Sequence, residues 1–299
     1  GAILLRNYLL EDMKYLLICT LSLVATYSFA QEKSWTPLLD KTLSQWGNYL
    51  SFRHRNNYNG KPPVDDQGVL IHPVGYNHDT TKVFSVIEDR GELILRVSGE
   101  IYGCLYTKNE FSNYHLKLKV KWGNNKYEPR LNKLKDSGIL YHSIGESGVD
   151  YWRSWMLSQE FQIMEGHMGD YWNIATSAVD IRAFLPEGKM NSVASVTQAF
   201  LPFGSGAPEG FCLRSENRES VDGEWTTLEL ITYGDKSLHI VNGYVVMVLR
   251  NSRYVKDGQS VPLVKGKIQL QSEAAEVLFK DIQIRSLQSI PENYTVYFR

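Results

Sequence analysis

Residues 114–122, Tyr114-His115-Leu116-Lys117-Leu118-Lys119-Val120-Lys121-Trp122, decide the fold class. Apolar and charged side chains alternate along this stretch, and successive side chains of a β-strand point to opposite faces. We therefore expect a strand that buries Leu116, Leu118 and Val120 and leaves the three lysines on the wet face. Antiparallel sheets with one solvated face typically have this alternation.

The clearest turn lies at Asn242-Gly243, between the apolar runs 237–241 and 244–248. Both central residues of a type I′ turn need a positive φ, which Asn and Gly adopt most readily. The sequence therefore predicts a two-residue β-hairpin at this point.

Other strand patterns complete the chain, and no long segment after residue 30 has the 3.6-residue period of an amphipathic helix. The further predicted strands span residues 91–97, 103–108, 136–142, 223–233, 266–272 and 276–285. Many short strands at this spacing indicate a β-sandwich or a β-barrel. The simplest partition is one domain over residues 34–288, followed by a C-terminal tail at 289–299.

Residues 13–30 contain the three parts of a secretory signal peptide. Met13-Lys14 supplies the charged start, residues 15–25 form the apolar core, and Ser28-Phe29-Ala30 offers small residues at the cleavage positions. A membrane anchor would need about 20 apolar residues, more than this run has. We expect residues 1–12 to be an upstream extension, cleavage after Ala30, a secreted or periplasmic mature chain, and no stable membrane insertion after cleavage.

The charge balance limits the class of partner that we expect, and the cysteine content limits the possible disulfides. The chain carries 32 basic and 33 acidic residues, which argues against nucleic acid as a partner. Cys104 and Cys212 follow the predicted cleavage site, and export would permit a disulfide between them. Whether their Cα atoms come within bonding distance is left open by the sequence.

The stretch from Ser158 to Asp170 concentrates the polar chemistry of the chain. Glu160 and Gln162 are two residues apart, so they share one strand face. Glu165 has the wrong parity, but a β-bulge at or near Met164 would bring it onto the same surface. Two such carboxyl groups could perform acid–base work on a sugar. The alternative is two glutamates on an exposed strand face.

Aromatic residues cluster around this stretch and favour a sugar-binding role. Sugars pack their C–H faces on aromatic rings, and ligand pockets add a few placed polar groups. The candidate substrate-binding residues are Gln162, Tyr141, Trp152, Trp155, Trp172, Lys108 and Arg130.

Six segments in order resemble the 3-keto-disaccharide hydrolase family. They are residues 38–46, 103–108, 136–142, 160–166, 223–225 and 279–285. The resemblance implies an exported protein with an all-β, two-sheet antiparallel jelly-roll sandwich of the concanavalin A type. It also implies that the concave sheet face holds a carbohydrate and that a glycosidic bond next to an oxidised sugar is cleaved.

A looser resemblance is to laminarinase-type glycosidases, whose catalytic strand has the pattern Glu-x-Asp-x-x-Glu. The segment Glu160-Phe161-Gln162-Ile163-Met164-Glu165 matches the outer two acids and places Gln162 where that family has Asp. By this resemblance, Glu160 and Glu165 would serve as nucleophile and acid/base.

A ketone at C3 of the sugar would allow a second route, because it makes the C2 proton acidic. A carboxylate or the imidazole of His142 or His167 could remove that proton, and the glycosidic bond would then leave by elimination. The enolate oxygen would need a partner, such as Lys108, Arg130 or a metal ion. Glu165, His167 and Asp170 lie close enough in sequence to ligate a divalent cation. The alternatives are structural histidines and no metal.

Two classes of function therefore stand after the sequence. The first is an exported enzyme that cleaves glycosides, either by plain hydrolysis or by elimination from a keto-sugar. The second is a lectin-like carbohydrate-binding module, since a fold of this kind does not fix the function.

Overall fold

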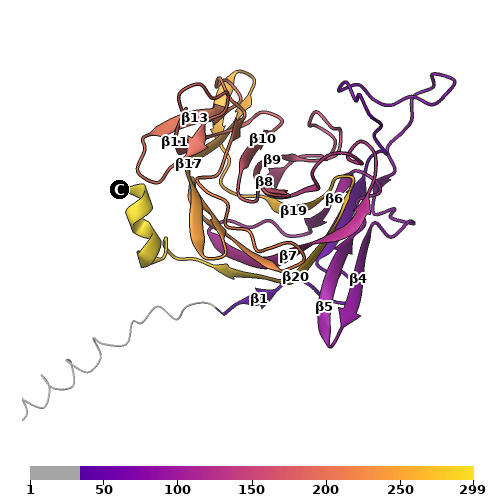
Figure 1. The fold of residues 1–299 in the computed structure, drawn as a ribbon, viewed down its shortest axis with the longest axis horizontal. Helices are drawn as coiled ribbons and strands as arrows, with labels where there is room; N and C mark the ends of the chain where they lie inside the picture. Colours follow the sequence, from indigo (N-terminus) through magenta and orange to yellow (C-terminus); the bar gives the residue numbers. More distant parts are fainter. Residues whose placement is uncertain (1–33) are drawn as a thin grey trace, which may run out of the picture. The chain divides into compact units, whose positions relative to one another are not determined.

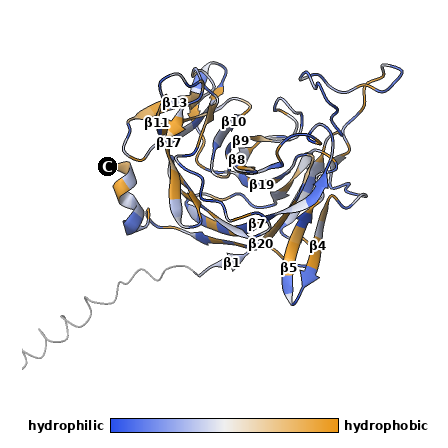
Figure 2. Ribbon diagram, viewed as in Figure 1, coloured by the Kyte–Doolittle hydropathy of each residue, from blue (hydrophilic) through white to orange (hydrophobic). Residues whose placement is uncertain are grey.

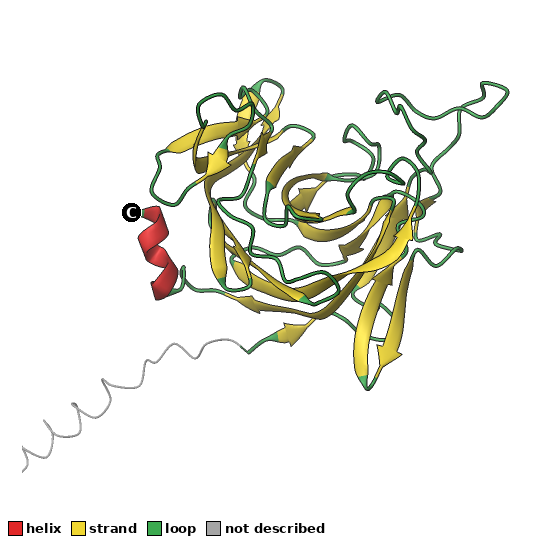
Figure 3. Cartoon of the chain, in the orientation of Figure 1, coloured by secondary structure: helices red, strands yellow, loops and turns green. Residues whose placement is uncertain are grey.

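A computed structural model describes residues 34–299 of the chain (Figure 1). The described part consists almost entirely of β-strands, with one 3-10 helix, η1 (Glu292–Phe298), near its C-terminal end (Figure 3). No helix within it is long and apolar enough to cross a membrane. The predicted extension and signal peptide, residues 1–30, lie outside the described residues.

Two antiparallel sheets make up the fold, as the resemblance implied. The main path of the twelve-stranded sheet runs β12 (Val193–Ala194), β11 (Ser177–Phe184), β17 (Tyr244–Lys256), β16 (Lys236–Val241), β15 (Thr226–Tyr233), β7 (Tyr114–Lys126), β20 (Ala275–Ser286), β5 (Glu92–Val97) and β4 (Phe84–Asp89). Beside it pair β1 (Thr36–Pro37), β13 (Phe200–Gly204) and β18 (Gln259–Pro262). The eight-stranded sheet runs β14 (Phe211–Cys212), β10 (Tyr171–Ile174), β9 (Leu157–Met164), β8 (Asp136–Ile144), β19 (Lys267–Ser272), β6 (Gly103–Thr107), β2 (Trp46–Leu50) and β3 (Gly75–Tyr76).

The main core lies between the two sheets. Leu116, Leu118 and Val120 of β7 are buried in it, which confirms the predicted alternation, and they share it with Phe161 and Ile163 of β9. Figure 2 shows apolar and polar residues interspersed along the strands. Full burial of one such side chain contributes about 1.5–3 kcal/mol, so these facing rows hold the sandwich together.

The predicted hairpin is confirmed at Asn242-Gly243. These two residues join β16 to β17, Val241 pairs with Tyr244, and the φ angles of Asn242 and Gly243 are 48° and 82°. The turn thus has a positive φ at both central positions, as type I′ requires.

The C-terminal residues set apart as a tail include η1, which packs on the fold. Its residues Tyr294, Tyr297 and Phe298 contact a buried cluster that contains Ile231. The guanidinium of Arg182 donates hydrogen bonds to the carbonyl oxygens of Tyr297 and Arg299. This end of the chain is therefore held by both apolar and polar contacts.

Cys104 and Cys212 are both free and buried, so the disulfide that the sequence left open does not form. Cys104 belongs to β6 and Cys212 to β14, and four strands of the eight-stranded sheet lie between these two. Neighbouring strands are about 4.8 Å apart, so the cysteines lie well beyond the ~7 Å limit for bridged Cα atoms.

Candidate active site

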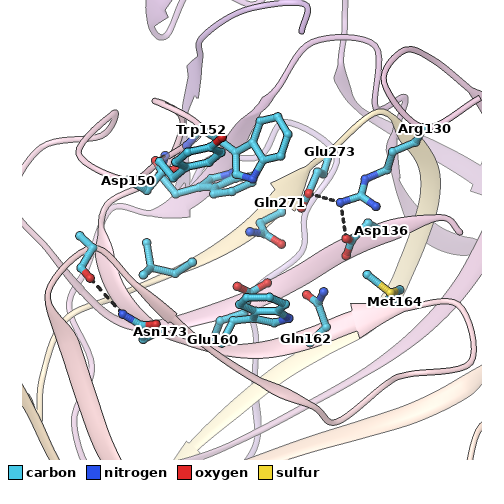
Figure 4. A pocket seen from close by; sticks show the side chains of 15 residues that line it. Arg130, Asp136, Asp150, Trp152, Glu160, Gln162, Met164, Asn173, Gln271 and Glu273 are labelled. Atoms are coloured by element: carbon cyan, nitrogen blue, oxygen red, sulfur yellow. Dashed lines mark hydrogen bonds and ion pairs between the residues drawn. The ribbon is translucent and has the colours of Figure 1, made fainter. Parts of the chain in front are cut away.

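A pocket of about 510 Å³ lies on the face of the eight-stranded sheet that is turned away from the twelve-stranded sheet (Figure 4). Strands β8, β9, β10 and β19 supply its floor, and the loops 127–135 and 145–156 supply walls. Its lining residues are Arg130, Asp136, Asp150, Tyr151, Trp152, Trp155, Glu160, Gln162, Met164, Trp172, Asn173, Ile174, Ala175, Gln271 and Glu273.

Strand parity places Glu160 and Gln162 in this pocket. Their neighbours Phe161 and Ile163 point into the core, so the two polar side chains point to the opposite face, as predicted. Gly138 of β8 pairs with Gln162, and a Cβ atom at Gly138 would collide with the Oε1 atoms of Glu160 and Gln271. The missing side chain of Gly138 therefore gives these groups their room.

Arg130 holds two buried carboxylates at one end of the pocket. Its Nη2 lies 2.5 Å from Asp136 Oδ2 and 2.5 Å from Glu273 Oε1. Burial raises the pKa of Asp136 well above its ordinary value, and the negative charge of Glu273 adds to the rise. One guanidinium thus faces two acids in a place with little water, which favours retention of a proton by the cluster.

Glu160 is the carboxyl group best suited to proton transfer. Only 4% of the residue is exposed. Burial raises the pKa of Glu160 well above its ordinary value, and the nearby charges of Glu273 and Asp136 raise it further. A carboxyl group with a raised pKa is both a stronger base and a group that can hold a proton nearer to neutral pH.

Several buried polar atoms of the floor have no hydrogen-bond partner within the described part of the chain. They are Oε1 of Gln162, both side-chain polar atoms of Gln271, and Oδ1 of Asp136. Buried polar groups are almost always paired in proteins. These atoms are therefore positioned to accept or donate hydrogen bonds to a polar ligand such as a sugar.

Aromatic side chains form the walls. Trp152 and Trp155 come from the loop between β8 and β9, and Trp172 comes from β10, where its ring lies 4.6 Å from that of Phe211. The Asp150 carboxylate accepts hydrogen bonds from the backbone N–H groups of Trp152, Ser154 and Trp155. Asp150 therefore fixes the tryptophan wall.

The structure brings six of the predicted site residues together in the pocket. They are Glu160, Gln162, Arg130, Trp152, Trp155 and Trp172. The other six lie elsewhere, for the reasons given next.

The predicted pairing of Glu165 with Glu160 is wrong. Strand β9 keeps an unbroken register with β8 from Glu160 to Met164, so no bulge at Met164 restores the parity of Glu165. Glu165 follows the end of β9, where its carboxylate accepts a hydrogen bond from the backbone N–H of Lys135 and lies 3.9 Å from Lys135 Nζ. It does not line the pocket.

His142 and Tyr141 were predicted as site residues, but neither side chain lines the pocket. His142 has a φ of 55°, in the part of β8 where the register with β9 shifts, and its ring contacts Tyr114 and Tyr141 in the interior. Burial lowers the pKa of His142 to about 3, so the ring is neutral. The Tyr141 hydroxyl lies 3.0 Å from the Ser237 hydroxyl, so it points into the sandwich.

His167 and Asp170 form a structural cluster with Arg214, so the predicted metal site is wrong. Asp170 Oδ1 accepts hydrogen bonds from the backbone and the guanidinium of Arg214, and Oδ2 lies 3.1 Å from His167 Nδ1. Within residues 34–299, no three His, Cys, Asp or Glu residues are grouped to hold a metal ion. Lys108 is also outside the pocket, because its Nζ donates to the carbonyl of Ser44.

Five polar residues of the pocket were not among the predicted site residues: Asp136, Asp150, Gln271, Glu273 and Asn173. Two of them had a local signal. Gln269 and Gln271 alternate with Ile268 and Leu270, which marks a polar strand face, and Asp136 shares a face with Gly138. Glu273 and Asp150 lie in loops between strands, where no periodicity indicates the direction of a side chain.

Three solved structures illustrate what the fold is similar to. A protein of Parabacteroides distasonis, named as a candidate glycosyl hydrolase, is 20% identical with a TM-score of 0.45, over 85% of this chain and 100% of that chain. A galectin-like protein of Bacillus subtilis is 13% identical with a TM-score of 0.38, over 85% and 94%. The β-glucanase of Bacillus licheniformis is 9% identical with a TM-score of 0.38, over 87% and 100%.

A comparison with curated protein sequences gives no match. Residues 34–285, in contrast, match a family described as the 3-keto-alpha-glucoside-1,2-lyase-like domain. The match spans the strands of both sheets and every residue that lines the pocket. The chain therefore belongs to the 3-keto-alpha-glucoside-1,2-lyase-like family.

Proposed function

We propose that this protein cleaves the glycosidic bond of a 3-keto-glycoside by elimination, with Glu160 as the proton-transferring residue. The observation that supports this most is a buried carboxyl group with a raised pKa on the floor of a pocket that has aromatic walls. Family membership supports a carbohydrate-related function. A 3-keto ring also supplies the acidic C2 proton that such a carboxylate needs.

In the first step, the Glu160 carboxylate takes the proton from C2, and the C–H electron pair forms an enolate across C2 and C3. The C3 carbonyl then re-forms as a C1=C2 double bond develops. The C1–O bond breaks, and its electrons leave on the glycosidic oxygen. Water adds to the double bond later, so the net result is hydrolysis.

The enolate oxygen needs hydrogen-bond donors or positive charge where its charge develops. The carboxamide nitrogen of Gln271 has no partner among the described residues and serves as such a donor. Arg130 adds a positive charge at the same pocket, held in place by Asp136 and Glu273. These groups are fixed before the sugar arrives, so little reorganisation is required during the reaction.

The leaving oxygen takes up a proton as it departs. Asp136 is the second candidate for proton transfer, because its pKa is also raised by burial and by Glu273. We propose that Asp136 delivers this proton while Glu160 retains the one from C2. Two acids in one pocket thus divide the work, and Asp136 takes the place that the sequence analysis gave to Glu165.

The experiment uses a synthetic 3-keto-glucoside, its C2-deuterated form and the unoxidised parent. Elimination predicts turnover of the keto substrate alone, a primary isotope effect from C2, and a C1=C2 unsaturated product that proton NMR detects. Equal cleavage of the unoxidised glucoside without an isotope effect would show plain hydrolysis. Tight binding of both sugars without turnover would favour the lectin-like module.

We also propose that the mature protein acts outside the cytoplasm. The support is the signal-peptide pattern of residues 13–30. N-terminal sequencing of the exported chain tests it, and a first residue of Gln31 is expected.

A further inference from the structure

An open groove of about 760 Å³ adjoins the pocket at the end formed by Arg130 and Met164. These two residues line both cavities, and Figure 4 shows them together at one end of the pocket, with Asp150 and Asn173 at the other. We call this groove the annex. Lys126, Lys133 and Leu134 complete its wall next to Arg130.

The annex has the opposite charge balance to the pocket. The pocket is lined by four carboxyl groups and one guanidinium, that of Arg130, which is paired with Asp136 and Glu273. The annex adds Lys126 and Lys133 against the single acid Glu165. Glu165 is itself engaged by the backbone and the ammonium group of Lys135. Its charge therefore offsets little of the positive charge in the annex.

The two lysines are available to a ligand. Among the described residues, no carboxylate forms an ion pair with Lys126 or Lys133. The Lys126 ammonium donates to the carbonyl oxygen of Lys133, which fixes one of its three N–H groups and leaves two free. Apolar surface from Leu134 and Met164 lies beside these charges.

We propose that the annex binds an anionic aglycone, that is, a leaving group with a carboxylate on an apolar or aromatic body. This inference rests on the proposed function, because it places the sugar ring in the pocket and its leaving group beyond Arg130. The lysines attract the carboxylate, while Leu134 and Met164 cover the apolar body. The pocket itself repels such a charge, so the annex sets the orientation of the ligand.

The test uses two glucosides of the same shape, 4-carboxyphenyl glucoside and its neutral 4-carbamoylphenyl analogue, each also prepared as the 3-keto form. Calorimetry measures the Kd of all four, and turnover is measured on the keto pair. The variants are Lys126→Ala/Lys133→Ala and, as a matched control, Lys189→Ala, an exposed lysine outside both cavities.

We expect wild type and the control to bind the carboxylate roughly three- to tenfold more tightly than the amide, as two ion pairs near the surface allow. The double variant should lose this ratio, and 0.3 M salt should reduce it in wild type. Equal Kd values in wild type, a ratio that survives the double substitution, or no binding of any glucoside would overturn the inference. A preserved Kd ratio without turnover of the keto pair would instead refute only the elimination.

Discussion

Gly138→Ala should damage catalysis far more than folding. A Cβ atom at this position would collide with the Oε1 atoms of Glu160 and Gln271, which are the far ends of flexible side chains. Gly138 has an ordinary β-strand backbone, so alanine brings no backbone strain. The new methyl group is therefore accommodated by displacing the two polar groups that the proposed reaction uses.

The magnitudes of the two effects differ. Overpacking a well-filled site costs about 1–3 kcal/mol of stability, and the lower end applies where side-chain ends can rotate away. A misplacement on the order of 1 Å costs about 10²-fold in rate, which corresponds to about 2.7 kcal/mol in the barrier. We expect kcat/KM on a 3-keto-glucoside to fall about 100-fold while Tm falls by a few degrees.

Gly47→Ala is the matched control. Gly47 lies in β2 of the same sheet, and the three atoms nearest to its added Cβ would all belong to the side chain of Tyr106, which is not a pocket residue. Steady-state kinetics and thermal unfolding of both variants separate a local displacement from general damage to the sheet. A Gly138→Ala enzyme within about twofold of wild-type kcat/KM, or a Gly47→Ala enzyme with the same loss, would show that displacement of Glu160 and Gln271 does not limit the reaction.

Three further predictions concern the pocket. The pKa of Glu160 lies above the usual 4.5 in the folded state, so the stability of the wild-type protein should fall as the pH rises above 4.5 toward the folded-state pKa. Glu160→Gln should therefore have a higher Tm than wild type at pH 7, and calorimetric scans should show this difference vanish near pH 4.5. Arg130→Ala leaves the carboxylates of Asp136 and Glu273 buried without their cation, so urea unfolding should show a free energy of unfolding about 3–5 kcal/mol lower than that of wild type. Because the cause is unpaired charge, this loss should shrink at acid pH, and an equal loss at acid pH would contradict that cause. Trp172→Ala should weaken glycoside binding roughly tenfold by calorimetry, whereas Trp172→Phe keeps most of it; equal losses would deny the ring a stacking role.

The strands and their faces followed from local rules. The alternation around Leu118 and the positive-φ requirement at Asn242-Gly243 depend only on neighbours in the chain, and the structure confirms both. The placement of Glu160 and Gln162 on one face followed from the same parity. For these features, the residue types of a few neighbouring positions are sufficient for the prediction.

The rest of the site depends on register and on distant segments. Whether Glu165 joins Glu160 is decided by the pairing of β9 with β8, and the register shift falls opposite the start of β9, between Tyr141 and Ile144, instead of at Met164. Arg130 and Glu273 are 143 residues apart in the sequence and form an ion pair, which no local sequence pattern predicts. The clustering of acidic and imidazole groups in the sequence suggested a functional role for His167 and Asp170, but in the structure these two residues stabilise a turn.

The role of Glu160 in proton transfer is tested by a comparison of Glu160→Gln with Glu165→Gln at neutral pH on methyl 3-keto-glucoside, whose methyl leaving group is too small to extend into the annex. Both substitutions keep the size of the side chain and remove its charge, and only Glu160 lines the pocket. Loss of a proton-transferring residue should reduce kcat/KM by about 10²–10⁴-fold for Glu160→Gln, while Glu165→Gln stays within about threefold of wild type. Equal losses for the two variants, or an active Glu160→Gln enzyme, would show that Glu160 does not transfer the proton.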